Sequence, residues 1–382
     1  MGVLVYSKRR ERWEHRSFLF YAYIAITIIF NPLMLNNKYI HLHLRGMIKI
    51  KTKVLAALLL FAILITATSC KPKNLTDEEV KPSPSIITEQ EKDESLRFVV
   101  MADCRGLDRG INEKMVTKTL ENIKKITPQP TFAVMPGDLV EGASSYSEEK
   151  AQLQYFKDTI TKYYSIDFFY PGFGNHEAKA GAKGEQAFEE VFPEMKAKFL
   201  EGYHKTVFYF DKNNIRFYML NSNHPSEDHI ISDAQLSWIK ANTDPAKKHN
   251  FYFFHEPAYP TGSHEGSSLD ANKQQRDKLW EVIDNAEKPM VFCGHEHNYT
   301  RRHINADFNE TINGQAFKFN KLVYQVTTGT FGAPVYKGYT NKRNVDIPPI
   351  PEYHFAIVDV NKSKVKVTVY NLDEKIIDQF EQ

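Results

Sequence analysis

Cysteine is scarce in this chain, which contains three such residues among 382. Two of them, Cys104 and Cys293, lie at the ends of apolar runs, and two thiols do not make a disulfide framework. We interpret both as small buried residues rather than as redox groups or metal ligands. The third, Cys70, follows small residues at 67–69 and belongs to a separate feature near the amino terminus.

Excess positive charge is also lacking once the amino terminus is set aside. The whole chain has a formal net charge of +2, but residues 1–69 carry ten basic and two acidic residues. This leaves 39 basic and 45 acidic residues from Cys70 onward, a net charge of about −6. The aromatic run at 251–254 has no interleaved basic residues, which indicates core rather than a base-stacking platform. Nothing in this composition indicates a surface for nucleic acids or anionic membranes.

Residues 47–70 have the pattern of a bacterial lipoprotein signal peptide. Three lysines at 49–53 precede an apolar stretch at 54–65, and small residues stand directly before Cys70. The apolar stretch is shorter than the ~20 residues that a membrane-spanning helix needs, which favours a cleaved signal. The alternative is an uncleaved anchor helix. The pattern predicts an exported lipoprotein of the bacterial cell envelope, attached through a lipid on Cys70 to the periplasmic or surface face of a membrane.

The segments on either side of this signal have different compositions. Residues 1–46 contain a second apolar segment at 18–35. Because Met47 begins a complete signal by itself, we interpret 1–46 as an extension upstream of the true start; the alternative is a membrane segment. Residues 71–95 are rich in proline, serine and acidic residues and are predicted to be a flexible tether. Residues 96–382 are predicted to form the folded, catalytic domain.

From residue 96 onward, short apolar runs alternate with longer amphipathic stretches, which is typical of an α/β domain. The predicted strands are 97–102, 131–135, 167–171, 215–221, 250–255 and 289–293. The predicted helices between them are 112–126, 148–164, 184–199, 233–242 and 272–285. Further strands, mostly antiparallel, are predicted at 321–328, 353–360, 364–371 and 375–380.

One predicted strand after another ends in a residue that is able to bind a metal. Because the carboxyl ends of strands in an open α/β sheet share one edge, such side chains converge there although they are scattered through the sequence. Each residue alone has an ordinary explanation as a turn or a helix cap, but six in order favour a metal site. Carboxylate, carboxamide and imidazole together suit Zn, Mn or Fe rather than a thiolate-rich structural site. The six residues are Asp103, Asp138, Asn175, His255, His295 and His297.

This order of residues resembles the calcineurin-like metallophosphoesterase superfamily. The family's blocks are Asp-x-His, Gly-Asp, Gly-Asn-His-Asp/Glu, a single His and Gly-His-x-His, and the resemblance covers about residues 96–334. The segments 255–259 and 328–334 look like the purple acid phosphatase branch. The resemblance implies a four-layer αββα sandwich with two central mixed β-sheets. It also implies a dinuclear metal centre that hydrolyses phosphate esters, such as small phosphomonoesters or nucleotides, by attack of a hydroxide formed at the metals.

The resemblance further implies a role for each matching residue. Two divalent or trivalent ions of Fe, Mn or Zn are implied. Asp138 would bridge them, Asp103 and His297 would bind the first ion, and Asn175, His255 and His295 would bind the second. His176 would lie near the leaving group as a general acid or charge stabiliser, with Glu177 orienting its ring.

Two positions depart from the family pattern. Arg105 stands where the family often has histidine, and Glu141 stands where purple acid phosphatases have tyrosine. A guanidinium does not bind a cation, so Arg105 is expected either to grip a phosphate oxygen or to form a salt bridge with a nearby acid. Glu141 is either a substitute ligand or a loop carboxylate in solvent. His264, in a glycine-rich loop, either lines the substrate entrance or is solvated.

The missing ligand at position 105 keeps a second class of function open. In that alternative the chain is a lipid-anchored surface binding module with a degenerate metal site and no turnover. The retained pair His176 and Glu177 argues against it, because metal storage has no use for a leaving-group acid. Metal-dependent phosphoester hydrolysis is therefore the main prediction from the sequence.

Overall fold

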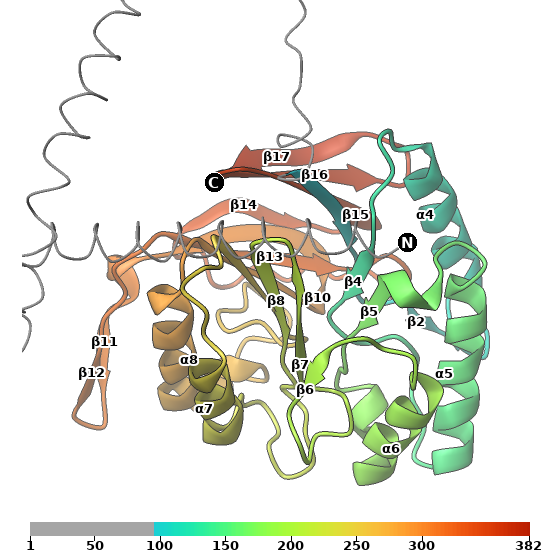
Figure 1. Cartoon of the computed structure of the whole chain (residues 1–382), viewed down its shortest axis with the longest axis horizontal. Helices are drawn as coiled ribbons and strands as arrows, with labels where there is room; N and C mark the ends of the chain where they lie inside the picture. The colour runs from blue at the N-terminus through green and yellow to red at the C-terminus, as the bar shows by residue number, and fades with distance from the viewer. Residues whose placement is uncertain (1–94) are drawn as a thin grey trace, which may run out of the picture. The chain divides into compact units, whose positions relative to one another are not determined.

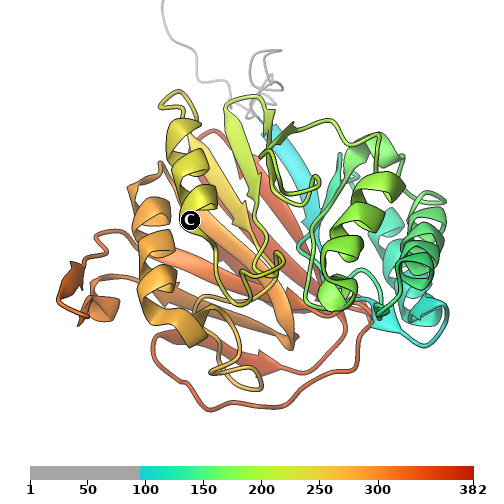
Figure 2. The same ribbon diagram turned by 90° about the horizontal axis from the view of Figure 1, so that it is seen from below.

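Two mixed β-sheets face each other in this protein, and helices cover the outer face of each sheet (Figures 1 and 2). The structure is a computed structural model and describes residues 95–382. The predicted upstream extension, the signal peptide with Cys70 and the tether up to residue 94 lie outside the described residues. Within 95–382, none of the helices has the length and apolarity needed to cross a membrane.

The first sheet has three parallel strands at one side and antiparallel strands from the carboxyl-terminal part of the chain at the other. Helices α4, α5 and α6 contribute buried side chains to the core on its outer face. The strand order is β17 (Ile376–Glu381), β16 (Lys364–Asn371), β15 (His354–Asn361), β1 (Ser95–Val100), β4 (Ala133–Met135) and β5 (Phe169–Pro171). The helices span Glu113–Lys125, Tyr146–Ile160 and Ala182–Val191.

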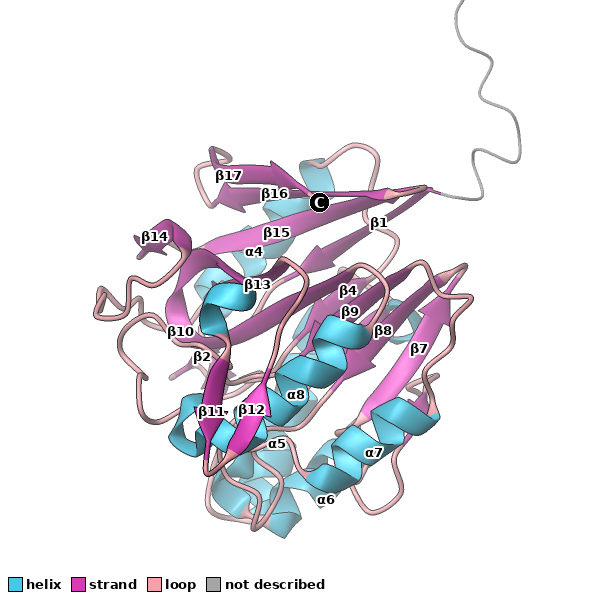
Figure 3. Cartoon of the chain, turned by 90° about the vertical axis from the view of Figure 1, so that its left-hand side faces the viewer, coloured by secondary structure: helices cyan, strands magenta, loops and turns pink. Residues whose placement is uncertain are grey.

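The second sheet is built around the parallel strands β8, β9 and β10. Its outer face is covered by α7 (Asp233–Ala241) and α8 (Lys273–Asn285), as Figure 3 shows. The strand order is β13 (Val323–Gly329), β10 (Pro289–Ile304), β9 (His249–Phe253), β8 (Ile215–Met219), β7 (Phe208–Lys212) and β6 (Lys198–Phe199), with β14 (Val345–Ile350) paired to β10. Two small hairpins, β2 (Arg105–Gly106) with β3 (Gly110–Ile111) and β11 (Glu310–Ile312) with β12 (Gln315–Phe317), lie outside the main sheets.

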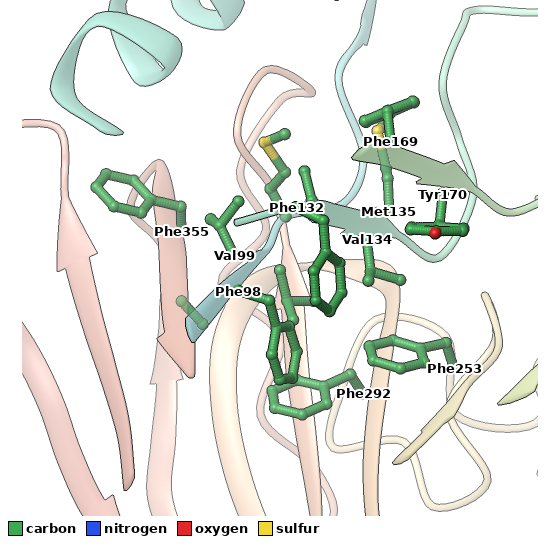
Figure 4. Close-up of a cluster of buried hydrophobic side chains, with 14 of the residues drawn as sticks. Phe98, Val99, Phe132, Val134, Met135, Phe169, Tyr170, Phe253, Phe292 and Phe355 are labelled. Atoms are coloured by element: carbon green, nitrogen blue, oxygen red, sulfur yellow. The ribbon is translucent and has the colours of Figure 1, made fainter. Parts of the chain in front are cut away.

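The run of aromatic residues at 251–254 is buried on both sides of the second sheet. Phe251 and Phe253 point into the core between the sheets, whereas Tyr252 and Phe254 pack beneath α7 and α8. Side chains alternate across a strand, so a strand covered on both faces is apolar at every position. Figure 4 shows the aromatic residues of the two sheets meeting between them. The interpretation of this run as core is thus confirmed, and Cys104 and Cys293 are buried free thiols as expected.

The sandwich confirms the fold class, while the structure differs from the sequence-based expectations at several local positions. The helix predicted at 184–199 ends at Val191, because Pro193 disfavours helical backbone at the preceding residue, and 198–199 form a strand. Strand β7 at 208–212 was not predicted, although its buried and half-buried side chains alternate. The strand predicted at 289–293 continues to Ile304, because its pairing with β13 absorbs register shifts between 291 and 298.

Candidate metal centre

The loops that carry the candidate ligands are held in unusual backbone conformations. Asp103, Asp138 and His295 all have positive φ angles, of 59°, 51° and 69°. Such values are uncommon for residues other than glycine and cluster at functional sites. A Cβ atom at Gly294 or Gly329 would lie 2.3 or 2.4 Å from Asp103 Oδ2, so only glycine permits this approach. The metal-binding edge is therefore shaped by close packing of backbone around carboxylates.

Four side chains converge on the position expected for the second ion. Asn175 Oδ1 lies 2.9 Å from His255 Nε2 and 3.0 Å from His295 Nδ1. The two ring nitrogens are 3.2 Å apart, and Asp138 Oδ1 is 3.2 Å from His255 Nε2. Neighbouring ligands bound at ~2.1 Å to one ion lie ~3.0 Å apart when they subtend a right angle. These separations fit the coordination shell of a single cation.

Each of the three metal-site histidines has one ring nitrogen against a backbone carbonyl. The ring nitrogens and their acceptors are His255 Nδ1 with Pro136 O at 3.1 Å, His295 Nε2 with Ser267 O at 3.4 Å, and His297 Nδ1 with Pro334 O at 2.6 Å. A carbonyl only accepts hydrogen bonds, so the nitrogen that faces it carries the proton. The other nitrogen of each neutral ring then presents a lone pair to the site, which is the form that binds a metal.

The residues expected for the first ion also lie together. Asp103, Asp138 and His297 each offer one ligand atom, and these atoms lie within 4.8 Å of one another. His297 Nε2 is 3.3 Å from Asp103 Oδ1. All three side chains are almost fully buried. Asp138 belongs to both groups of ligands, as a bridging carboxylate would.

The electrostatics of the site fit bound cations. Burial, together with the charges of Asp103 and Glu177, raises the pKa of Asp138 well above its usual value. Burial also lowers the pKa of His255 to about 4 and that of His295 well below its usual range. The rings are therefore neutral and cannot balance the carboxylates. Lone pairs of nitrogen and oxygen face one another across about 3 Å here, and a shared cation relieves that repulsion.

Glu177 does not orient the His176 ring as the resemblance implied. Its buried carboxylate accepts hydrogen bonds from the backbone N–H groups of Asp138 (3.0 Å), Val140 (3.0 Å) and Gly174 (2.7 Å). These bonds join the loop after β4 to the loop after β5. Glu177 is therefore a positioning residue for the loop that carries Asp138.

His176 is positioned by other groups. Its Nδ1 lies 2.6 Å from the carbonyl oxygen of Glu141 and 2.9 Å from Lys179 Nζ, and its Nε2 is 3.9 Å from Asp138 Oδ2. Burial and the charge of Arg105 lower the pKa of His176 to about 4. The ring lies at the edge of the metal site and is neutral near pH 7 in the free protein.

Arg105 and Glu141 form an ion pair beside the carboxylate of Asp138. Arg105 Nη1 donates to Glu141 Oε2 at 3.0 Å, its Nη2 donates to the Tyr336 hydroxyl at 3.1 Å, and its Nε lies 3.9 Å from Asp138 Oδ2. The Tyr336 ring stacks on His297, with ring centroids 4.2 Å apart. Burial acts to raise the pKa of Glu141, but the hydrogen bond from Lys179 and the charge of Arg105 lower it. Glu141 is thus an ion-pair partner rather than a freely solvated carboxylate.

His264 lies next to the metal site at the end of a fixed loop. Its ring packs against that of His295, with centroids 3.9 Å apart and the ring planes tilted by 32°. The buried Glu296 accepts hydrogen bonds from the backbone N–H groups of Thr261 (2.8 Å) and Gly262 (2.7 Å) and from the Thr261 hydroxyl. Glu296, between the two histidines of Gly-His-Glu-His, therefore fixes the loop that carries His264. This supports the interpretation that His264 lines the substrate entrance.

Three further residues shape this site, although their roles were not predicted from the sequence. Tyr336 lies two residues after the segment 328–334, and this proximity to a recognised segment could have indicated its role. Lys179 and Glu296 had no distinguishing signal, because a lysine in a polar segment and a glutamate between two histidines are common. Their roles depend on hydrogen bonds to residues 35 to 38 positions away along the chain.

Comparisons with known proteins agree with this geometry. A family model described as calcineurin-like phosphoesterase matches residues 96–299, more than half of the chain. The structure is similar to purple acid phosphatase PPD1 from yellow lupin (Lupinus luteus) seeds, with a TM-score of 0.60 and 17% identity over 75% of this chain and 53% of that chain. It is also similar to PhoD, with a TM-score of 0.56 and 11% identity over 75% and 72% of the two chains. No curated protein sequence matches.

These findings give the class of protein. The chain belongs to the calcineurin-like phosphoesterase family. At these identities the two solved structures show a shared fold, and this chain spans about half the length of the lupin phosphatase.

The loop that carries Glu141 depends on a buried carboxylate in α5. Glu149 Oε2 accepts a hydrogen bond from the Ala143 backbone N–H at 2.7 Å. Burial and the nearby charge of Glu177 raise the pKa of Glu149 from 4.5 to about 8. Between pH 4.5 and about pH 8, Glu149 keeps a proton in the folded protein that it releases in the unfolded chain. This contribution therefore lowers the free energy of unfolding as pH rises, and it levels off above about pH 8.

We predict that Glu149→Gln removes this pH dependence. Between pH 5 and pH 7, the free energy of unfolding of the variant rises relative to that of the unmodified protein by about 1 kcal/mol per pH unit. The upper limit for one titrating group is about 1.4 kcal/mol per pH unit. Denaturant unfolding across this range measures the difference. Glu121→Gln, at an exposed position of helix α4, is the matched control and shows no such trend. A pH-independent difference for Glu149→Gln contradicts the prediction.

Proposed function

We propose that this protein is a two-metal phosphoesterase that hydrolyses small phosphomonoesters or nucleotides. The observation that supports it most is the convergence of ring nitrogens, each fixed by a backbone carbonyl, on the oxygens of Asn175 and Asp138. This donor set suits Fe, Mn or Zn. The family supports phosphoester hydrolysis as the reaction.

The residues would divide between the two ions as follows. Asn175, His255 and His295 would hold one ion, Asp103 and His297 the other, and Asp138 would bridge them. When bound, two such ions lower the pKa of a water molecule and neutralise charge on the phosphate oxygens. Glu177 and the backbone carbonyls keep these ligands in place, so the protein does not reorganise during the reaction.

The chain's own groups at the rim would handle the substrate. Arg105 lies beside Asp138 with its Nη groups directed to Glu141 and Tyr336, and an incoming phosphate can exchange with the Glu141 carboxylate for bidentate binding. The negative charge of a bound phosphate raises the pKa of His176 and favours the protonated form. That form donates a proton to the leaving oxygen from Nε2, the nitrogen that faces Asp138.

The first prediction concerns metal dependence. Chelation abolishes hydrolysis of p-nitrophenyl phosphate, and adding back Zn²⁺, Mn²⁺ or Fe²⁺ restores it with about two ions per chain at saturation. His255→Ala lowers kcat/KM by at least about 100-fold, because it removes a ligand of the second ion. His303→Ala, farther along β10 and paired with Asp346, leaves turnover unchanged. One bound ion or none, with no turnover, would instead support the surface binding module.

The second prediction concerns His176. His176→Ala lowers kcat for alkyl phosphates by roughly 10²–10⁴-fold, because a poor leaving group needs a proton. The effect on p-nitrophenyl phosphate is smaller, since that leaving group departs without one. Metal content measured by mass spectrometry stays at the value of the unmodified protein. Full turnover of alkyl phosphates by a variant that retains its metal removes this assignment.

We also propose that the protein is an exported lipoprotein of a bacterial envelope, which the pattern at 47–70 supports. In a bacterial host, the full-length chain is expected to incorporate labelled palmitate and to fractionate with membranes. Cys70→Ala is expected to lose the label and to leave the membrane fraction. A Cys70→Ala variant that stays in the membrane fraction without label would favour the uncleaved anchor helix.

A further inference from the structure

The two oxygens of the bridging carboxylate Asp138 face different surroundings. Oδ1 faces the second-ion group, 3.2 Å from His255 Nε2, and accepts the His176 backbone N–H at 3.1 Å. Oδ2 faces Arg105 Nε and His176 Nε2, each at 3.9 Å. A permanent positive charge therefore stands beside the oxygen that is left for the first ion.

Arg105 is fixed in this position from two sides. Glu141 and the Tyr336 hydroxyl accept hydrogen bonds from its two Nη atoms. Tyr336 is itself held by stacking on His297 and by its backbone N–H, which donates to the His297 carbonyl at 2.8 Å. The Nε atom of Arg105 is buried and has no hydrogen-bond partner within residues 95–382. The guanidinium cannot move away from Asp138 without breaking two hydrogen bonds.

The two ion sites differ in ligands and in charge. The second site has four converging protein ligands: Asp138, Asn175, His255 and His295. The first has three, Asp103, Asp138 and His297, and a guanidinium where the family often supplies a histidine. Arginine stays protonated in proteins, so it repels a cation at the first site at every accessible pH.

We propose that Arg105 makes the two metal sites unequal, so that the second site fills first and the first site binds its ion at least about tenfold more weakly. This inference rests on the proposed two-metal function. The guanidinium supplies part of the positive charge that the first ion would provide beside Asp138. The two sites then fill in two separate steps as the metal concentration rises.

Titration of metal-free protein with Zn²⁺ alone, followed by calorimetry and by equilibrium dialysis, tests the proposal. The unmodified protein is expected to show two binding steps separated by about tenfold or more in affinity. Arg105→Gln narrows the separation by removing the charge, and Arg105→His narrows it further by adding a ligand. Arg109→Gln, on the same hairpin and mostly exposed, is the matched control and keeps both steps unchanged.

Two ligand variants assign the steps. His295→Ala removes the tight step, and His297→Ala removes the weak step. The tight step also reports folding of the Arg105 variants, because the ligands of the second site are intact in them. Equal affinities in the unmodified protein, an unchanged separation in Arg105→Gln, or loss of the tight step in His297→Ala overturns the proposal. Absence of phosphatase turnover at saturating Zn²⁺ with two unequal steps would contradict the proposed function alone.

Discussion

Asp103 joins the two sheets at the edge where the metal ligands meet, and the geometry of the site depends on this connection. Its carboxylate accepts the backbone N–H of His295 at 3.0 Å, and its carbonyl accepts the N–H groups of Gly332 and Ala333 at 3.1 and 2.9 Å. Asp103 follows β1 of the first sheet, whereas His295 lies within β10 of the second sheet and Gly332 and Ala333 follow β13. The packing between the sheets therefore sets the distances between ligands, and the aromatic core keeps those distances fixed.

Much of the site was predictable because each ligand follows a strand end that the sequence marks clearly. The blocks around Asp138 and Asn175 follow β4 and β5 of the first sheet, and the block around His255 follows β9 of the second. The strand ends of the two facing sheets bring these blocks together. Ring orientation was not predictable in the same way, since it is set by carbonyls such as Pro136 O, 119 positions away from His255. The role of Glu177 was mistaken for a similar reason, because its partners are backbone N–H groups that carry no sequence signature.

In the fold, too, elements that depend on local sequence were predicted well, whereas elements that depend on pairing with distant segments were not. Helices such as α4 and α8 have clear amphipathic patterns and capping residues, and their predicted bounds lie within a residue or two of those in the structure. Strand β10 was predicted too short, because its extension beyond Cys293 depends on pairing with β13 through a bulge. Pairing between distant segments decides where such a strand ends, and single-sequence periodicity does not report it.

Charge in the site is arranged as a buried negative centre with a positive rim. The carboxylates of Asp103, Asp138 and Glu177 are buried, whereas Arg105 and Lys179 lie closer to solvent. Cations at the centre and an anionic substrate at the rim both complement this arrangement. Glu141 offsets part of the positive charge of the rim, since it pairs with both Arg105 and Lys179. In the proposed function, a phosphate that replaced Glu141 on Arg105 would exchange one anion for another and would leave the guanidinium paired.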